Sequence, residues 1–202
     1  MKRLFDIVFS VLGLIISLPV IIVITILIRA EDHGSTLYQG LRIGYGGKPF
    51  KMYKFRTMVS GAENLGGSNT SNVDVRITKI GHKLRKTKLD ELPQLLNVLK
   101  GDMSFVGPRP ETAFYVNMFT EEEKKILSVK PGITDWATLW DHDEGTVLAQ
   151  YSDPDKAYLE IIRPMKIKLQ LKYLEEHTFF CDLKIIWLTI KTIINKKSTK
   201  LS

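Results

Sequence analysis

The chain of 202 residues is poor in the residues that build disulfides and metal clusters. It has one cysteine, Cys181, so it can form neither an intramolecular disulfide nor a cysteine-based zinc site. Its four histidines lie far apart, without the spacing of metal ligands. No internal repeat is visible. A single unpaired cysteine is typical of proteins from a reducing compartment.

Acidic residues are also in deficit, since 29 Lys and Arg stand against 22 Asp and Glu. The formal charge of +7 and the pI near 9.4 imply an anionic partner, which charge alone leaves open among nucleic acid, anionic lipid and a phosphorylated small molecule. With 44% hydrophobic residues the chain can build a real core, which excludes a disordered chain.

One long stretch, from Ile7 to Ile28, contains no charged residue at all. As a straight helix rising about 1.5 Å per residue it is long enough to span a bilayer. Pro19, at its centre, removes a backbone donor and crowds the preceding turn, while Ser17 can satisfy a freed carbonyl. Each arm beside this break covers only about 15 Å, half a bilayer.

Basic residues flank this stretch on both sides, which favours a cytoplasmic location for both of its ends. They are Lys2 and Arg3 before it, and Arg29, Arg42, Lys48, Lys51, Lys54 and Arg56 after it. The sequence therefore predicts a re-entrant membrane hairpin over residues 1–30 and a cytoplasmic catalytic domain over 31–202. A kinked full span and a buried core helix stay open. A signal peptide is less supported, because no small-residue cleavage site follows.

Residues 34–60 alternate in short runs broken by glycines, which predicts extended segments joined by turns, with a turn at residues 44–47. Alternation places Tyr53 and Phe55 on one face and Lys54 and Arg56 on the other, so the basic face can meet phosphate. A solvated edge strand explains the same pattern. Residues 61–73, rich in Gly, Ser, Asn and Thr, read as a mobile loop or a lid.

Two adjacent carboxylates, Asp90 and Glu91, stand where a helix is expected to begin. Leucines recur at helical spacing from residue 92 to 99, Pro93 fits only a first turn, and Gly101 is a natural stop. Exposed backbone N–H groups and the helix dipole should keep both carboxylates ionised. The structural alternatives are that Asp90 only caps the helix, or that Thr87 caps it with Asp90 closing a capping box.

An arginine follows this helix on a stiff turn, the segment Gly107-Pro108-Arg109-Pro110. The planar fork of donors on Arg109 is suited to gripping a phosphate. Paired carboxylates beside such an arginine, with basic segments on both sides, indicate an active site.

The C-terminal half contains fewer chemical signals. The acidic run at residues 141–144 fits a solvated loop better than a second metal site. Residues 156–176 read as a long polar helix, and 182–197 as an amphipathic interfacial helix that either lies on the membrane or packs on the core. The expected fold class is α+β, mainly helical with short strands.

These blocks together resemble the bacterial sugar transferases known as monotopic phosphoglycosyl transferases, and the resemblance covers nearly the whole chain. The blocks that carry it are Lys2-Arg3 with Phe5-Asp6, Lys54-Phe55-Arg56-Thr57-Met58, Arg76-Ile77-Thr78, Leu89-Asp90-Glu91-Leu92, Asn97-Val98-Leu99-Lys100-Gly101-Asp102-Met103-Ser104, Val106-Gly107-Pro108-Arg109-Pro110 and Pro131-Gly132-Ile133-Thr134.

The resemblance implies transfer of a phosphosugar from a UDP-sugar to polyprenyl (undecaprenyl) phosphate at the cytoplasmic face of a bacterial inner membrane, with release of UMP. It implies Asp90 as the nucleophile, Glu91 as the ligand of Mg²⁺, and Arg85 and Arg109 as phosphate-binding residues. Lys54 and Arg56 are further candidates for phosphate binding. This reaction would begin the assembly of a glycoconjugate or polysaccharide, lipopolysaccharide included.

The chain departs from the family pattern at two places. Leu18 separates Ser17 from Pro19, which are usually adjacent, and Asp135-Trp136-Ala137-Thr138 stands where Gly-Trp-Ala-Gln is frequent. Because larger relatives carry extra N-terminal membrane segments, the chain is expected to be a minimal catalytic form.

Two rival functions stay open at this level: the same transfer by direct attack with Asp90 as base, and a non-catalytic basic membrane adaptor. Nucleic-acid binding is not expected, because it would leave the apolar stretch without a role.

Overall fold

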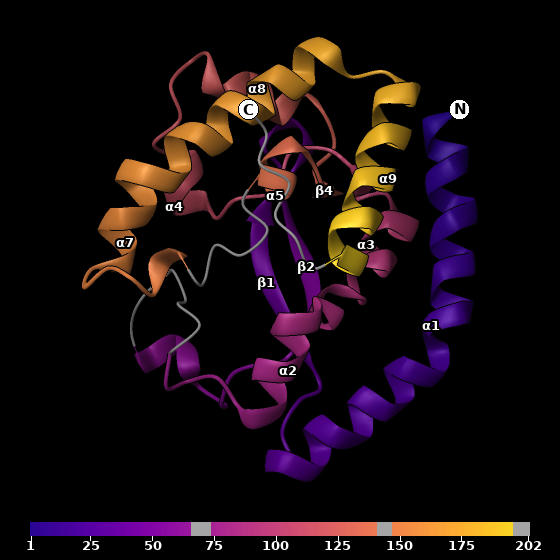
Figure 1. The fold of residues 1–202 in the computed structure, drawn as a ribbon, viewed down its shortest axis with the longest axis vertical. Helices are drawn as coiled ribbons and strands as arrows, with labels where there is room; N and C mark the ends of the chain where they lie inside the picture. The colour runs from indigo at the N-terminus through magenta and orange to yellow at the C-terminus, as the bar shows by residue number, and fades with distance from the viewer. Residues whose placement is uncertain (66–73, 141–146, 196–202) are drawn as a thin grey trace.

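The computed structural model of the protein describes residues 1–65, 74–140 and 147–195 (Figure 1). The acidic run at 141–144 and most of the expected loop at 61–73 lie outside these residues; the described part of that loop holds the short 3-10 helix η2 (Ala62–Leu65). The described chain is mainly helical with short strands, which confirms the coarse α+β prediction.

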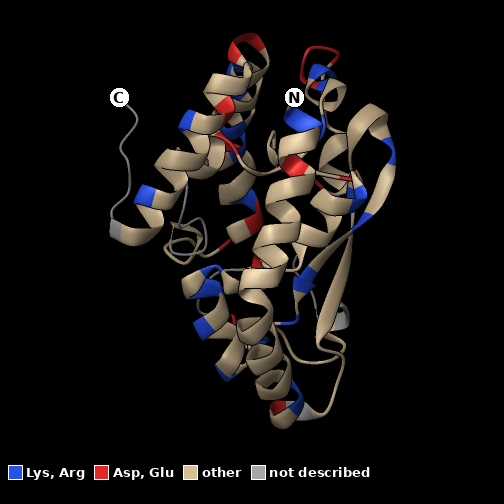
Figure 2. Cartoon of the chain, turned by 90° about the vertical axis from the view of Figure 1, so that its right-hand side faces the viewer, with Lys and Arg blue, Asp and Glu red and all other residues tan. Residues whose placement is uncertain are grey.

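The apolar N-terminal stretch forms one helix, α1 (Lys2–Asp32), with Pro19 inside it. In Figure 1 this helix bends part-way along, and in Figure 2 the side that faces the viewer is tan between charged ends. It is the helix in the described chain that is long and apolar enough to cross a membrane. Where the sequence predicts a hairpin of two arms, the structure has a single bent helix.

The hydrogen bonds around Pro19 explain why the helix bends without breaking. Pro19 removes only the donor that would meet the carbonyl of Ile15, four residues earlier. Ser17 was expected to satisfy such a freed carbonyl, but its Oγ donates to the carbonyl of Gly13 at 2.6 Å. A serine bonded four residues back and a proline are both known causes of helix bending.

Polar side chains fasten the first turn of α1 to distant parts of the chain. Lys2 pairs with Asp182 of the C-terminal helix, and Arg3 donates to the carbonyls at the end of the helix that ends at Lys100. Asp6 is almost fully buried and accepts bonds from Ser104 Oγ at 3.1 Å and from the next backbone N–H at 3.2 Å. The charges of Lys2 and Arg3 are therefore engaged by protein groups, which weakens their use as evidence for topology.

The extended segments form an antiparallel hairpin of β1 (Leu37–Ile43) and β2 (Pro49–Phe55), joined through the 3-10 turn η1 (Tyr45–Gly47). Both the strands and the glycine turn confirm the prediction. Gly46 and Gly47 have positive φ angles of 65° and 74°, which glycine adopts without strain. Phe55 is buried, as alternation predicts for one face of β2.

The paired carboxylates lie on the 3-10 turn η3 (Leu89–Glu91), which connects α2 (Lys79–Thr87) to α3 (Gln94–Lys100). Gly101, with φ 92°, ends α3 as predicted. The predicted start is wrong by one turn, because Asp90 and Glu91 lie on η3 before α3. Thr87 does not cap this helix either, since its hydroxyl donates back to the carbonyl of Lys83 within α2.

The remaining elements are, in chain order, β3 (Ser104–Val106), α4 (Ala113–Val116), η4 (Glu123–Ser128), β4 (Gly132–Thr134), α5 (Trp136–Trp140), α7 (Pro154–Ala157), the π-helical turn η5 (Tyr158–Ile162), α8 (Arg163–Glu176) and α9 (Phe179–Asn195). The expected helix at 156–176 is thus a continuous run of α7, η5 and α8. β3 and β4 pair in parallel, a pairing that the sequence pattern did not indicate.

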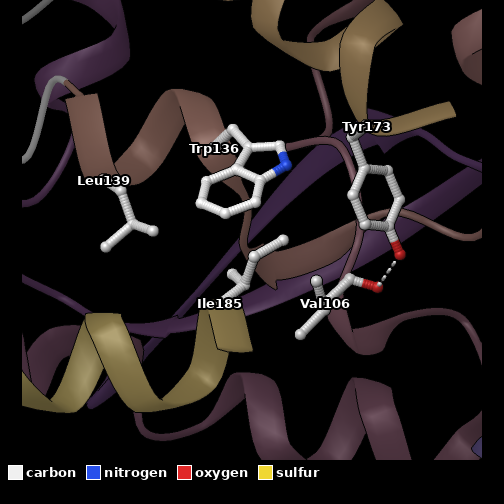
Figure 3. Close-up of a cluster of buried hydrophobic side chains, with 5 residues drawn as sticks. All are labelled: Val106, Trp136, Leu139, Tyr173 and Ile185. Atoms are coloured by element: carbon white, nitrogen blue, oxygen red, sulfur yellow. Dashed lines mark hydrogen bonds between the residues drawn. The ribbon is translucent and has the colours of Figure 1, made fainter. Parts of the chain in front are cut away.

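A core cluster joins β3, α5, α8 and α9 through Val106, Trp136, Leu139, Tyr173 and Ile185 (Figure 3). α9 contributes Ile185, which is fully buried, while Phe180 and Trp187 on the same helix remain 81% and 59% exposed. The prediction that this helix packs on the core is therefore confirmed for one of its faces, while its other face is an exposed apolar surface.

Candidate active site

The structure brings residues from four separate segments to the paired carboxylates. Lys54 comes from β2, Arg85 from α2, Asp90 and Glu91 from η3, and Arg109 from the turn after β3. Arg56 does not join them: it donates to Ser60 Oγ at 2.6 Å and lies against Gly34. Five of the six predicted catalytic and phosphate-binding residues, Lys54, Arg85, Asp90, Glu91 and Arg109, therefore lie together, and Arg56 is the exception.

Glu91 is held by two cations. Its Oε1 accepts from Lys54 Nζ at 3.0 Å and from Arg109 Nη2, and its Oε2 accepts from Arg109 Nη1 at 3.3 Å. Burial disfavours the charged form of Glu91, but the charges of Arg109 and Lys54 and the bonds they donate outweigh it and hold its pKa well below the ordinary value. Glu91 is therefore ionised, and its carboxylate accepts hydrogen bonds from both cations.

Asp90 has the opposite environment although it is the next residue. It is only 7% exposed, and its Oδ1 has no hydrogen-bond partner in the described part of the chain. Burial raises the pKa of Asp90, and the neighbouring charge of Lys54 opposes this rise. The expectation that helix N–H groups favour the ionised form of both carboxylates is wrong in its cause for Asp90, because α3 begins only at Gln94 and Asp90 caps neither helix.

Arg85 stands beside Asp90 without a direct bond to it. Its Nε donates to Thr57 Oγ1 at 2.9 Å, which fixes the guanidinium from α2 against the end of β2. Burial lowers the pKa of Arg85, whereas the charge of Asp90 raises it. A guanidinium remains charged even so, and thus provides a fixed positive charge next to Asp90.

Gln94 is a residue that reasoning from the sequence missed. Its side chain is fully buried, and neither its Oε1 nor its Nε2 has a hydrogen-bond partner among the described residues. Together with Asp90 Oδ1, these are three of the five such atoms found. Buried polar atoms are nearly always bonded, so this concentration within five residues indicates a place where water or a ligand is expected. The signal in the sequence was that Gln94 is a polar residue within the apolar pattern of α3.

Comparison with known proteins decides the family. A profile of the family described as "Bacterial sugar transferase" matches residues 1–196. The chain belongs to the bacterial sugar transferase family.

Relatives in this family differ in length. The chain is 38% identical over 194 residues to a Bacillus subtilis protein named "Uncharacterized sugar transferase EpsL", covering 96% of this chain and 87% of that protein. It is 34% identical to the UDP-N-acetylgalactosamine-undecaprenyl-phosphate N-acetylgalactosaminephosphotransferase of Aeromonas hydrophila over 96% of this chain and 43% of that protein. It is also 34% identical to the UDP-glucose:undecaprenyl-phosphate glucose-1-phosphate transferase of Escherichia coli, over 97% of this chain and 41% of that protein. The chain thus spans less than half the length of the two relatives whose names state a reaction.

The carboxylates present can fit Mg²⁺ in the manner this ion prefers. Mg²⁺ is commonly held by one or two carboxylates, with water and substrate phosphates completing the shell. Asp90 offers one buried oxygen without a partner, and Glu91 can offer another if a phosphate takes over Lys54 and Arg109. No group of three or more His, Cys, Asp or Glu residues that could hold a metal ion gathers in the described chain, here or elsewhere.

Asp90→Asn is expected to raise the melting temperature at about pH 8 and to have no such effect below about pH 4. Because burial raises the pKa of Asp90, the stability linked to this group is complete below the ordinary aspartate pKa of about 3.9 and is lost as pH rises through the pKa in the fold. Asparagine keeps the shape and removes the charge. Thermal unfolding in detergent across this pH range measures the difference between the two proteins.

The matched control for this experiment is Asp153→Asn at the cap of α7, where no pH-dependent gain is expected. An Asp90→Asn protein no more stable than the unmodified protein at pH 8 would contradict the assigned environment.

Proposed function

We propose that this chain moves a phosphosugar from a UDP-sugar to polyprenyl phosphate through a covalent intermediate on Asp90. The observation that carries the proposal is the pair of adjacent carboxylates in opposite environments. Glu91 is committed to two cations, while Asp90 presents a buried oxygen without a partner in the described chain, near the charges of Lys54 and Arg85. A carboxylate oxygen without a hydrogen-bond donor is well suited to attack phosphorus.

The proposed reaction has two steps that balance in atoms and charge. An Asp90 carboxylate oxygen attacks the β-phosphorus of the UDP-sugar, and the bond from this phosphorus to the bridging oxygen breaks, so UMP leaves with the electron pair. A phosphate oxygen of polyprenyl phosphate then attacks the same phosphorus. This breaks the bond to Asp90, regenerates the carboxylate and gives the polyprenyl-diphosphate sugar.

The cations of the site would neutralise the charge of the transferred phosphoryl group. Arg109 and Lys54 now share the carboxylate of Glu91, and a diphosphate carries more charge and more acceptor oxygens than one carboxylate. Binding of the UDP-sugar would therefore move the hydrogen bonds of Arg109 and Lys54 from Glu91 to the phosphate oxygens. Arg85 would remain beside Asp90 and stabilise the acyl phosphate, since phosphoryl transfer depends mainly on positioning and charge neutralisation.

We also propose that Mg²⁺ binds at Glu91 once the donor has displaced its cations. When bound there, the ion supplies charge neutralisation at the diphosphate oxygens. Residues of the chain provide the rest: Glu91 holds the ion, and Arg109, Lys54 and Arg85 bind phosphate.

The location proposed for this chemistry is the cytoplasmic face of a bacterial inner membrane. Support comes from the apolar surface of α1 and from the exposed side of α9, where Phe180 and Trp187 stand out from the core. Tryptophan and a lysine such as Lys191, which lies over its ring, suit the headgroup boundary. The polyprenyl acceptor would reach the site from this boundary.

The covalent step predicts a burst without acceptor. Enzyme mixed with a suitable UDP-sugar and Mg²⁺, but no polyprenyl phosphate, should release about one UMP per active site and retain labelled phosphosugar. A panel of UDP-sugars labelled in both the sugar and the uridine, followed by quench and protein separation, measures both products.

Asp90→Asn should abolish this burst, while Asp102→Asn, a nearby carboxylate outside the site, should keep it. Direct transfer with Asp90 as base stands instead if lipid-dependent turnover is normal but neither UMP nor labelled protein forms without lipid. No turnover with any UDP-sugar would favour a non-catalytic membrane adaptor.

Metal removal supplies another test. Activity is expected to vanish in EDTA and to return with added Mg²⁺, because the exchange at Glu91 leaves its carboxylate to the ion. The assay is UMP release at saturating donor. Full turnover in EDTA would remove Glu91 from its proposed role as metal ligand.

The topology prediction from the flanking charges places both Met1 and Ser202 on the cytoplasmic side. In a chain whose Cys181 has been replaced by serine, a cysteine introduced near Met1 should resist a membrane-impermeant thiol reagent on intact spheroplasts and react after permeabilisation. Labelling of intact spheroplasts would show a full span of α1 and exclude re-entry.

A further inference from the structure

The main chain of Arg109 is held on both sides by buried polar side chains. Asp135 is fully buried, and its Oδ2 accepts the backbone N–H of Arg109 at 3.3 Å. Gln170 of α8 is almost fully buried, and its Nε2 donates to the Arg109 carbonyl at 3.4 Å. Both polar groups of this peptide position are therefore fixed by side chains that come from elsewhere in the fold.

The second oxygen of Asp135 ties the same carboxylate to α5. Asp135 Oδ1 accepts from the backbone N–H of Thr138 at 2.7 Å and from its hydroxyl at 2.8 Å, in the manner of a helix N-cap. One carboxylate thus joins the start of α5 to the turn that carries Arg109. The two residues that depart from the family pattern, Asp135 and Thr138, are bonded to each other.

The turn itself leaves Arg109 little freedom to move. Gly107 N–H donates to the carbonyl of Thr134 at 3.1 Å, and Gly132 N–H donates to the carbonyl of Pro108 at 3.0 Å. A side chain at Gly107 would collide with the backbone of Lys130, so the two segments approach as closely as glycine permits. The prolines on both sides of Arg109 further restrict its backbone.

We propose that Asp135 is a positioning residue that sets where the guanidinium of Arg109 meets the donor diphosphate, an inference that rests on the proposed function. The guanidinium reaches Glu91 from this anchored peptide. A shift of the peptide moves the guanidinium away from phosphate, and small misplacements in a phosphate clamp cost catalysis heavily. A carboxylate is required because it offers two acceptor oxygens and no donor.

The test is Asp135→Asn, which keeps the shape but leaves one of the two backbone N–H groups facing an amide N–H₂. The expected result is a fall in kcat/KM for UMP release of roughly tenfold to a hundredfold, with a higher KM for the UDP-sugar. Faster hydrogen exchange at the Arg109 amide is expected in the same protein, and this second measurement needs no turnover.

Two variants separate positioning from loss of a helix cap. Asp153→Asn makes the same change at the cap of α7, where Asp153 Oδ1 accepts from Lys156 N–H at 3.0 Å, and should retain full activity. Thr138→Val removes one bond to Asp135 but leaves the Asp135–Arg109 bond, and should lower kcat/KM less than twofold. Equal losses in all three proteins would overturn the proposal.

A double-mutant cycle tests whether Asp135 acts through Arg109. In an Arg109→Lys background, Asp135→Asn should have less than a twofold further effect, because the positioned group is already altered. The same loss in both backgrounds, or unchanged activity and exchange in Asp135→Asn, would overturn the proposal. Faster Arg109 exchange in Asp135→Asn, combined with an unmodified protein that uses no UDP-sugar, would sustain the anchor and refute the proposed function instead.

Discussion

The pairing of the Glu91 carboxylate with Arg109 and Lys54 is the interaction on which the site depends. It joins β2, η3 and the turn after β3. Removal of the Glu91 carboxylate would leave both partly buried cations without this counter-charge, and breaking a buried ion pair in this way is strongly destabilising. The same pairing holds the positive charges of Lys54 and Arg109 at the residue next to Asp90.

Asp90 and Glu91 are adjacent in the sequence, but their side chains lie in opposite environments. The backbone of η3 points Glu91 toward two cations and leaves Asp90 in a buried position with one oxygen unbonded. Gln94, one turn further on, is also buried with both polar atoms unbonded. Protein interiors rarely tolerate such groups unless a ligand or reaction uses them, so this short stretch gives up stability where chemistry is expected.

The apolar helix is not a loosely attached appendage. Lys2, Arg3 and Asp6 fasten its first turn to α9, α3 and β3, and Phe5 packs edge-on against Phe179 at the start of α9. Figure 1 shows α9 beside this end of α1. The N-terminal part of α1 is therefore bonded directly to the strand that leads into the Arg109 turn.

The sequence by itself determined the features that depend on near neighbours: the alternating strands and glycine turn of the hairpin, the stop of α3 at Gly101, the adjacent carboxylates and the stiff turn at Arg109. The motifs in the sequence also indicated the family. Only the tertiary structure decided which cations reach Glu91, that Asp90 is buried, and that Asp135 and Gln170 anchor Arg109. It also showed that the apolar stretch forms one bent helix with Pro19 inside it. Burial and pairing join residues dozens of positions apart, and no local spacing encodes the environment that distant segments create around a side chain.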